Sequence, residues 1–433
     1  MNATIRPFGL SVATFLVFAS AALGQGPLTP PGPPGPMFKT LQQIEPRTPI
    51  SSLPFTITNA GSYYLTTNLT ATPGVTDGIM IAAHDVSLDL NGFALVGASN
   101  SHNGIAAIGI RTNITIRNGT VRNWTGIGVF MNDAHDGILE KLRVSNNGSS
   151  PLDGGIVVHT GFRVIDCTVN DNMGYGIVAR YHANISGSTA TGNSSYGIFA
   201  NRATIQGCAA NGNRSGIVAD RGCTVSSCTA TENQGDGILA GPGCTISECT
   251  ATDNLVNGIV AGSGSAVSDC TAIDNAGDGI VAGAGSSVMG CTARSNEGDG
   301  ISAAAGSTIR DCTATENTGD GIEVTEDCRV VENTCDGNGY LTGDGAGIRV
   351  TGQQNRIDSN LATDNDRGIH VTAIRNFIVR NSVRMSGSNY VIVAGNRIAQ
   401  IVQPAVNSAN ITNANTGSTD GFTGVDPWAN FSH

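Results

Sequence analysis

Residues 237–254 read GILAGPGCTISECTATDN, and a unit of this kind returns along the chain about every 21 residues. The dipeptide Gly-Ile opens each unit, and the steps between units are 21 residues except for one of 19 and one of 26. The opening glycines are Gly155, Gly176, Gly197, Gly216, Gly237, Gly258, Gly279, Gly300, Gly321, Gly347 and Gly368. Repetition at a fixed period of this length indicates stacked units, each of which buries its apolar face against its neighbours.

One unit contains three short apolar stretches separated by turn residues. Ile238 to Ala240 is followed by Gly-Pro-Gly, then Cys244 and Ile246 alternate with polar residues, and a bend near Glu248 leads to the third stretch. No apolar period of helical length appears, and antiparallel hairpins would need turn signals at half this spacing. The sequence therefore predicts an all-β solenoid of parallel coils, with about 21 residues and three short strands in each coil.

Stacking in register turns equivalent residues into columns with a rise of about 4.8 Å per coil. A cysteine column comprises Cys228, Cys249, Cys270, Cys291 and Cys312. An asparagine column comprises Asn233, Asn254, Asn275, Asn296 and Asn317. Side-chain amides in such a column can bond the coils above and below, satisfying backbone groups that a bent strand leaves unpaired.

The coil pattern and the asparagine column resemble right-handed parallel β-helix proteins of the pectin-lyase-like type. The stretches EPRTPISSLPFTITNAGSYYL, DVSLDLNGFALVG and NITIRNGTVRNW are similar to the entry coils of secreted bacterial members. The resemblance spans roughly residues 40–433 and implies a single-stranded right-handed parallel β-helix of about sixteen coils. It implies no single activity, because this fold carries lyases, hydrolases, epimerases, adhesins and inert scaffolds.

The two ends of the sequence differ from the repeats. Residues 1–24, with Arg6 before an apolar stretch and Ala22-Leu23-Gly24 after it, predict a secretory signal peptide, with a retained anchor as the alternative. Residues 25–40 predict a Pro/Gly-rich linker, residues 41–405 the β-helix with an N-terminal cap and irregular entry coils, and residues 406–433 a capping tail. We expect a secreted or extracytoplasmic protein, in the periplasm or at the cell surface, with no transmembrane segment in the mature chain.

Eleven cysteines in an exported chain admit two interpretations. Stacked cysteines have parallel Cβ vectors, which is poor geometry for a disulfide, so we expect most of them to be buried thiols. A disulfide framework is the alternative, and Cys328 and Cys335 are its best candidates because neither fits the regular ladder cleanly.

Acidic residues concentrate in the regular coils. Fifteen Asp and Glu lie between Gly222 and Cys328 against Arg294 and Arg310, in a chain whose net charge is −11. One column comprises Glu232, Asp253, Asp274, Ser295 and Glu316; another comprises Asp236, Asn257, Asp278, Asp299 and Asp320. These are expected to be turn residues on a solvated edge; the alternative is Ca²⁺ binding by Asp236, Asp278, Asp299 and Asp320.

A second candidate site lies four residues after the Gly-Ile glycine. The regular coils carry glycine or alanine there, whereas earlier coils carry His159, Arg180, Asn201 and Asp220, flanked by Tyr181, His182, Arg202 and Arg221. A run of functional side chains where the repeat needs only a small turn residue is a break in local consistency, and such breaks gather at functional sites. The simpler explanation is that early coils are less regular, with surface pairs that contribute little.

The first function hypothesis is an exported scaffold that presents a long face to an extended polysaccharide or to a cell-surface partner. The alternative is a Ca²⁺-assisted lyase or epimerase acting on uronate polymers, with Arg180 and Asp220 as candidate catalytic residues. The sequence lacks the family's hydrolase signatures Asn-Thr-Asp, Gly-His-Gly and Arg-Ile-Lys and the epimerase motif Asp-Pro-His-Glu. His135 with Asp136 is a poor candidate for a general base and the carboxylate that orients it, because adjacent residues of a strand point to opposite faces. The acidic balance argues against nucleic acid as a partner.

Overall fold

The computed structural model describes residues 46–74, 77–339, 343, 345–402, 411–412 and 427–432. The chain divides into the units Met1–Pro46 and Arg47–His433, and every strand among the described residues belongs to the second. The expected signal peptide (residues 1–24) and linker (residues 25–40) lie outside the described residues. No helix suited to crossing a membrane occurs in the part of the chain that is described.

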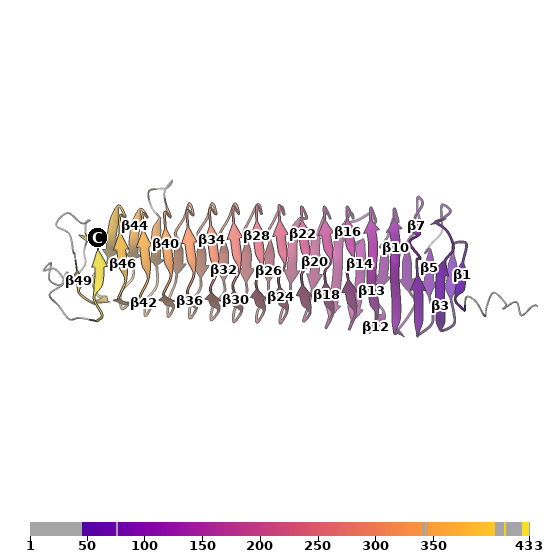
Figure 1. The fold of residues 1–433 in the computed structure, drawn as a ribbon, viewed down its shortest axis with the longest axis horizontal. Coiled ribbons are helices and arrows are strands. Elements are labelled where there is room, and N and C mark those ends of the chain that lie inside the picture. The colour runs from indigo at the N-terminus through magenta and orange to yellow at the C-terminus, as the bar shows by residue number, and fades with distance from the viewer. Residues whose placement is uncertain are drawn as a thin grey trace, which may run out of the picture. The chain divides into compact units, whose positions relative to one another are not determined.

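Each strand of the unit Arg47–His433 pairs in parallel with the equivalent strand of the next coil (Figure 1). One coil holds β26 (Ile238–Ala240), β27 (Thr245–Ser247) and β28 (Thr250–Thr252). The register advances by one repeat, so that Ile238 pairs with Ile259 and Ile246 with Val267. The predicted all-β solenoid with three short strands per coil is confirmed.

Two strands of each coil belong to one sheet of 32 strands, called sheet A, and the third belongs to sheet B. The longest strands of sheet A are β10 (Ile114–Arg122) and β13 (Ile138–Ser145). The strands of sheet B are β2 (Phe55–Ile57), β5 (Ile79–Ile81), β8 (Ile105–Ala107), β11 (Val129–Met131), β14 (Gly154–Thr160), β17 (Tyr175–Tyr181), β20 (Tyr196–Ala200), β23 (Ser215–Ala219), β26, β29 (Ile259–Ala261), β32 (Ile280–Ala282), β35 (Ile301–Ala303), β38 (Ile322–Val324), β41 (Ala346–Val350), β44 (Arg367–Val371), β47 (Ser388–Ile392) and β50 (Ile411–Thr412). A small third sheet pairs β9 (Arg111–Thr112) with β12 (Ala134–His135).

Single residues in the left-handed region form the corners of sheet A. Glu248, with φ 54°, joins β27 to β28 and reverses which face the following side chains occupy. The acidic column predicted from the sequence marks the next corner, with φ between 53° and 56° at Glu232, Asp253, Asp274, Ser295 and Glu316. A bend built from one residue needs no loop, so the strands on either side stay in register with the neighbouring coils.

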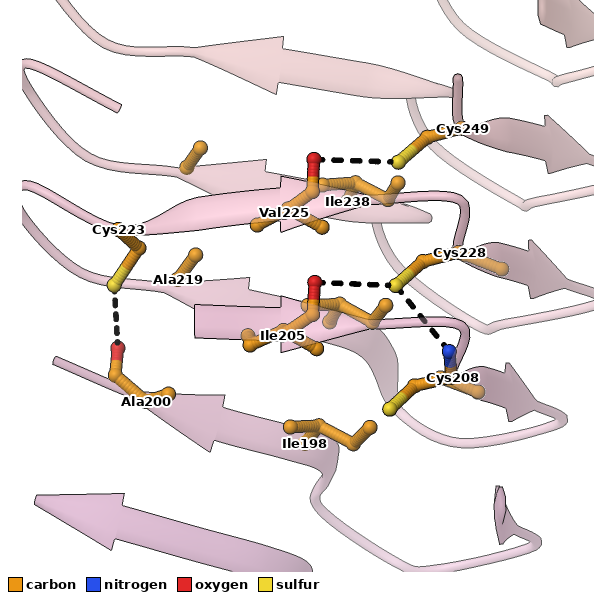
Figure 2. Packing of buried hydrophobic residues seen from close by; sticks show 14 of the residues in the cluster. Ile198, Ala200, Ile205, Cys208, Ala219, Cys223, Val225, Cys228, Ile238 and Cys249 are labelled. Atoms are coloured by element: carbon orange, nitrogen blue, oxygen red, sulfur yellow. Dashed lines mark hydrogen bonds between the residues drawn. The ribbon is translucent and has the colours of Figure 1, made fainter. Parts of the chain in front are cut away.

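The interior is filled by columns of small and aliphatic side chains. All eleven cysteines are buried thiols, as Figure 2 shows for four of them. The Cys228 thiol donates to the carbonyl oxygens of Ser226 (3.2 Å) and Ile205 (3.6 Å). Cys335 takes the place of an alanine, pairing in register with Ala314 and Ala362, and so lies outside the cysteine column as expected. The alternative of a disulfide at Cys328 and Cys335 was wrong, since both are free thiols.

A ladder of asparagine amides runs through the core. Asn254 donates through Nδ2 to Asn275 Oδ1 (2.9 Å) and to the Ala230 carbonyl (3.1 Å), and its backbone N–H donates to the same Asn275 oxygen. The predicted bonding between coils is confirmed. The ladder also explains the recurring glycine, because a Cβ on Gly258 would lie 2.7 Å from Asn275 Nδ2 and 2.6 Å from the Gly279 carbonyl oxygen.

Near the C-terminal end the cysteine column becomes a second amide ladder. Asn333, Asn360 and Asn381 each donate to the next asparagine oxygen, and Asn381 donates to Asn430. Asn430 belongs to β51 (Asn430–Ser432), which pairs with β46 (Ser382–Arg384) and β49 (Ile401–Val402). The tail of the chain thus contributes a strand and a ladder amide to the last coils.

Candidate functional site

The sequence-predicted column of polar residues lies at one corner of successive coils. His159 is on β14 and Arg180 and Tyr181 are on β17, where Thr160 pairs with Tyr181. The His159 ring contacts the Tyr181 ring edge-on, with 5.8 Å between the ring centres. Arg180, Tyr181 and His182 are exposed, so this corner presents its side chains to solvent.

His135 joins this group, although the sequence analysis considered it only beside Asp136 and not with His159. The ring of His135, on β12, lies 5.1 Å from that of His159 and perpendicular to it. Partial burial first, and then the neighbouring His135 and Arg180, lower the pKa of His159 below its ordinary value. Only the stacking of coils brings the two histidines together, and no local motif marks the pair.

The remaining residues of the predicted column lie on the next two coils. Asn201 Nδ2 donates to Asp220 Oδ2 over 2.7 Å, and the backbone N–H of Arg202 donates to the Arg221 carbonyl oxygen. Arg180 lies two coil steps from Asp220, about 10 Å at the rise of parallel strands. The structure therefore places these residues along one edge and gives Asp220 an amide partner in place of Arg180.

Asp236, Asp278, Asp299 and Asp320, for which Ca²⁺ binding was the alternative to a role as turn residues, follow one another along the stack of coils. Each carboxylate accepts a hydrogen bond from the backbone of the next coil. Asp278 Oδ1 accepts the N–H of Asp299 (2.8 Å), and Asp299 Oδ1 accepts the N–H of Asp320 (2.7 Å). Asp236 receives both the backbone and the side-chain amide of Asn257. The side chains of this column therefore accept backbone N–H groups and link one coil to the next. Asn257 lies between Asp236 and Asp278 in the column.

Three carboxyl groups converge at the end of that column. Asp299, Asp320 and Glu323 each offer an oxygen within 4.8 Å of the other two. Burial, together with the nearby Glu323 and Asp278 carboxylates, raises the pKa of Asp299 to about 7. Burial and the charge of Asp299 raise the pKa of Asp320 to about 6. This carboxyl cluster can therefore hold a proton near neutral pH.

Glu323 also belongs to a column on the outer face of sheet B. Two residues after each opening glycine the side chain lies on the outer side of the strand by alternation, although Val157 (4%), Val178 (8%) and Val218 (9%) are themselves covered by their neighbours. The paired residues of this column are Phe130, Val157, Val178, Phe199, Val218, Leu239, Val260, Val281, Ser302, Glu323, Arg349 and His370. The change from apolar to polar residues at Ser302 is a signal that the sequence analysis missed.

Aromatic rings lie at the opposite part of the same face. Tyr175 and Tyr196 precede their coils' opening glycines, and their ring centres lie 5.6 Å apart. The Tyr196 ring stacks on Phe199, at 6.2 Å and an angle of 23° between the ring planes. From Tyr175 to His370 the face extends over nine coil steps, about 43 Å.

The charged part of this face combines acid, base and cation. Arg349 pairs in register with Glu323 and His370, and its Nη1 donates to Asp320 Oδ2 over 3.4 Å. Protonated carboxyls and an imidazole can exchange protons, and a guanidinium can hold a carboxylate or a hydroxyl group. The sheet B face, defined as Tyr175, Tyr196, Phe199 and the outward column to His370, is thus suited to a long polar ligand that also offers apolar ring faces.

A family model described as the right-handed beta helix region matches residues 56–204, 155–290, 200–338 and 283–383. No curated protein matches the sequence. Among solved structures, the periplasmic alginate epimerase AlgG is similar at 14% identity and a TM-score of 0.41, over 65% of this chain and 78% of that one. The A-module of the Azotobacter vinelandii mannuronan C-5 epimerase AlgE4 is similar at 13% identity and 0.38, over 78% and 91%. The receptor-binding domain of the siphovirus 9NA tailspike is similar at 12% identity and 0.40, over 87% and 79%.

Proposed function

We propose that this chain, which belongs to the right-handed β-helix family, binds an extended polysaccharide along the sheet B face. The observation that carries the proposal is the continuous outward column with stacked aromatic rings at one part and the Glu323–Arg349–His370 row at the other. Aromatic faces pack against sugar rings, and carboxyl, guanidinium and imidazole groups bond hydroxyls. The coils repeat at about the length of one sugar residue, so an extended polymer meets equivalent positions in successive coils.

The expected signal peptide places this activity outside the cytoplasm, at the cell surface or in the periplasm. The scaffold role and the binding role are then one proposal, in which a rigid stack presents the face to an envelope or environmental polysaccharide.

Binding is tested by isothermal titration with defined oligosaccharides, after a glycan array has selected them. Removing the ring in Tyr196→Ala should weaken binding about fivefold, because a stacked ring contributes about 1 kcal/mol beyond its buried area. Met289→Ala, on strand β33 (Ser287–Met289) of sheet A, is the matched control for loss of an exposed apolar side chain. Equal effects of the two variants would contradict binding along the sheet B face.

Catalysis on a uronate polymer is the second candidate, favoured by the carboxyl cluster. A carboxyl group with a pKa near neutrality can donate or accept a proton at a sugar carbon or at a leaving oxygen, and Arg349 can hold the uronate carboxylate. A lyase would release an unsaturated product with ultraviolet absorbance, and an epimerase would exchange the C5 hydrogen with solvent deuterium. Loss of either signal in Glu323→Gln, with retention in Asp220→Asn, would assign the chemistry to this cluster.

Ca²⁺ is proposed as a cofactor only at the same cluster. Asp299, Asp320 and Glu323 supply hard oxygen ligands, although Asp320 already accepts bonds from the Ala346 N–H and Arg349. A rise in melting temperature with CaCl₂ that is lost in Glu323→Gln would support this role.

A further inference from the structure

A hollow of about 500 Å³ lies on the outer side of the last coils, away from the sheet B face. Its lining comes from β45 (Phe377–Val379), β48 (Arg397–Ile398) and the tail, and comprises Phe377, Val379, Asn396, Arg397, Ile398, Ala399 and Trp428. A second hollow of about 520 Å³ shares Phe377 and Arg397 with the first and adds Gln354, Arg375, Asn376 and Gly395. Volumes of this size suit a small ligand or one or two units of a polymer.

Two aromatic rings in the lining are held in place from behind. The Arg356 guanidinium lies 5.1 Å from the centre of the Phe377 ring, and that of Arg380 lies 5.0 Å from Trp428. The backbone N–H of Arg380 also donates to the Trp428 carbonyl oxygen over 3.1 Å. Each ring therefore has one face covered by an arginine, although Phe377 and Trp428 remain 36% and 46% exposed.

One buried carboxylate fixes both arginines. Asp358, whose side chain is 3% exposed, accepts from Arg356 Nη2 (2.7 Å) and from Arg380 Nε (2.7 Å). Because the carboxylate holds the guanidinium groups and these hold the rings, the two rings are pre-organised before any ligand arrives. We call this arrangement the clamp; it comprises Asp358, Arg356, Arg380, Phe377 and Trp428, and its hydrogen bonds and ring contacts all lie in the last coils.

The hollow is also positively charged. Arg397 and Arg375 line the two hollows, and no Asp or Glu contributes to either lining, in a chain whose net charge is −11. The Arg397 guanidinium has no hydrogen-bonding or ionic partner among the residues that the structure describes, and its side chain is exposed. A guanidinium with five free donors beside aromatic rings is suited to a planar anionic group on a ring-shaped ligand.

We propose that this hollow binds an anionic sugar residue, with the sugar ring against Phe377 and Trp428 and its carboxylate or sulfate on Arg397. The inference deepens the proposed function by naming the charge of the bound sugar, but it concerns a separate site on the last coils. With one site on the sheet B face and another in the hollow, the protein could bind a single polysaccharide chain at two points or two separate polysaccharide chains.

The test uses the full chain and three probes: tri-galacturonate, its methyl ester, and a sulfated disaccharide. Wild-type protein should bind the carboxylate probe, the sulfated probe or both at least tenfold more tightly than the neutral ester, because a charge-assisted bond is lost in the ester. Arg397→Gln should remove this preference while leaving the weak binding of the ester unchanged. Preference for one anionic probe distinguishes carboxylate from sulfate.

Arg329→Gln is the matched control, since Arg329 is an exposed arginine in the column of sheet A that runs in register through Arg356 and Phe377 to Arg397. Trp428 gives a direct readout, because the other tryptophan, Trp124, is 1% exposed. Bound sugar should protect Trp428 fluorescence from iodide quenching in wild-type protein and in Arg329→Gln but not in Arg397→Gln.

Any of four outcomes would overturn the proposal. Two concern the binding assay: the ester and the acid bind equally, or the two arginine variants have equal effects. The others are that a saturating probe leaves iodide quenching unchanged, or that residues of this chain's own tail fill the hollow. Thermal unfolding of Arg397→Gln should match that of the wild type, since the side chain is exposed. The result is separable from that for the sheet B face, because Tyr196→Ala leaves the hollow intact and Arg397→Gln leaves the face intact.

Discussion

The middle coils and the last coils follow one plan and differ in what they add to it. Between Gly222 and Cys328 there are fifteen acidic residues and two arginines, whereas between Arg329 and Val402 there are eight arginines and six acidic residues. The middle coils expose corner residues such as Asp253 and Asp274 to solvent, but the last coils bury Asp358 beneath two guanidinium groups. Charge is thus spread over the surface in one region and organised into a clamp in the other.

The interiors of the two regions teach a related lesson. In the inner column that contains the regular cysteines, the backbone N–H of Cys167 donates to Ser188 Oγ (3.2 Å), that of Cys208 to Cys228 Sγ (3.4 Å) and that of Cys312 to Asn333 Oδ1 (2.9 Å). The inner column therefore requires an acceptor at each coil and accepts a thiol, a hydroxyl or an amide. The middle coils use the small acceptors and the last coils use asparagine.

The largest effect is expected from breaking the amide ladder that both regions share. In Asn275→Leu the buried partners Asn254, Asn296 and Ala251 lose their bonds, which should cost about 4 kcal/mol of unfolding free energy. Urea unfolding followed by circular dichroism measures the loss. Asn381→Leu, in the last coils, should cost a similar amount, and a loss in only one of the variants would show that the regions do not share the same support.

A smaller loss should separate the buried ion pair of the last coils from the surface pairs of the middle coils. Burial would raise the pKa of Asp358, but the bonds to Arg380 and Arg356 outweigh it and lower that pKa to about 2. The ionised carboxylate therefore contributes to stability above pH 4, and this contribution is lost as the pH falls toward 2. Asp358→Asn should cost about 2 kcal/mol at pH 7, since the arginines can still reach solvent. Asp311→Asn, which breaks the exposed pair with Arg310, should change the unfolding free energy by less than about 0.5 kcal/mol.

A gain in stability is expected where the middle coils crowd their carboxylates. The folded-state pKa of Asp299 is raised to about 7, so its charge destabilises the protein above that pH, and stability rises as the pH falls from 7 toward 4. Asp299→Asn keeps the oxygen that accepts the Asp320 N–H, as Asn257 does for Asp278, and should add about 1 kcal/mol at pH 8. The gain should shrink as the pH falls and vanish near pH 4, below which the carboxyl is protonated in both states. Asp236→Asn, at the other end of the column, is the control, and a gain independent of pH would contradict this explanation.

The smallest effect is expected from exchanging one acceptor for another in the inner column. Cys270→Ser preserves a donor and an acceptor where Ser188 already serves in the same column, so it should cost less than about 1 kcal/mol. Melting temperature is the measurement. A large loss would show that the middle coils need the volume of sulfur as well as its bonding.

The coil, its register and the amide ladder could be predicted from sequence because each depends on one period. Ile246 lies beside Val267, and Asn254 beside Asn275, because the members of each pair are 21 residues apart. The repeat length therefore predicts both contacts. The carboxyl cluster was predicted only in part, since Asp299 and Asp320 share a column but Glu323 comes from the outward column of the next strand. The clamp could not be predicted, because Trp428 reaches Arg380 from the tail, beyond the end of the periodic sequence.

The amide ladder has a direction. In the side-chain bonds between amides, each asparagine donates through Nδ2 to the Oδ1 of the neighbour closer to the C-terminus and accepts from the neighbour closer to the N-terminus, from Asn147 and Asn172 through to Asn338 and Asn365. The two ends of the ladder are therefore chemically unlike: the first amide offers an oxygen and the last needs one, as Asn430 supplies for Asn381 in the second ladder. Two such molecules could continue one another's ladder only head to tail, and a coil could be inserted or removed anywhere along the row without reversing its polarity.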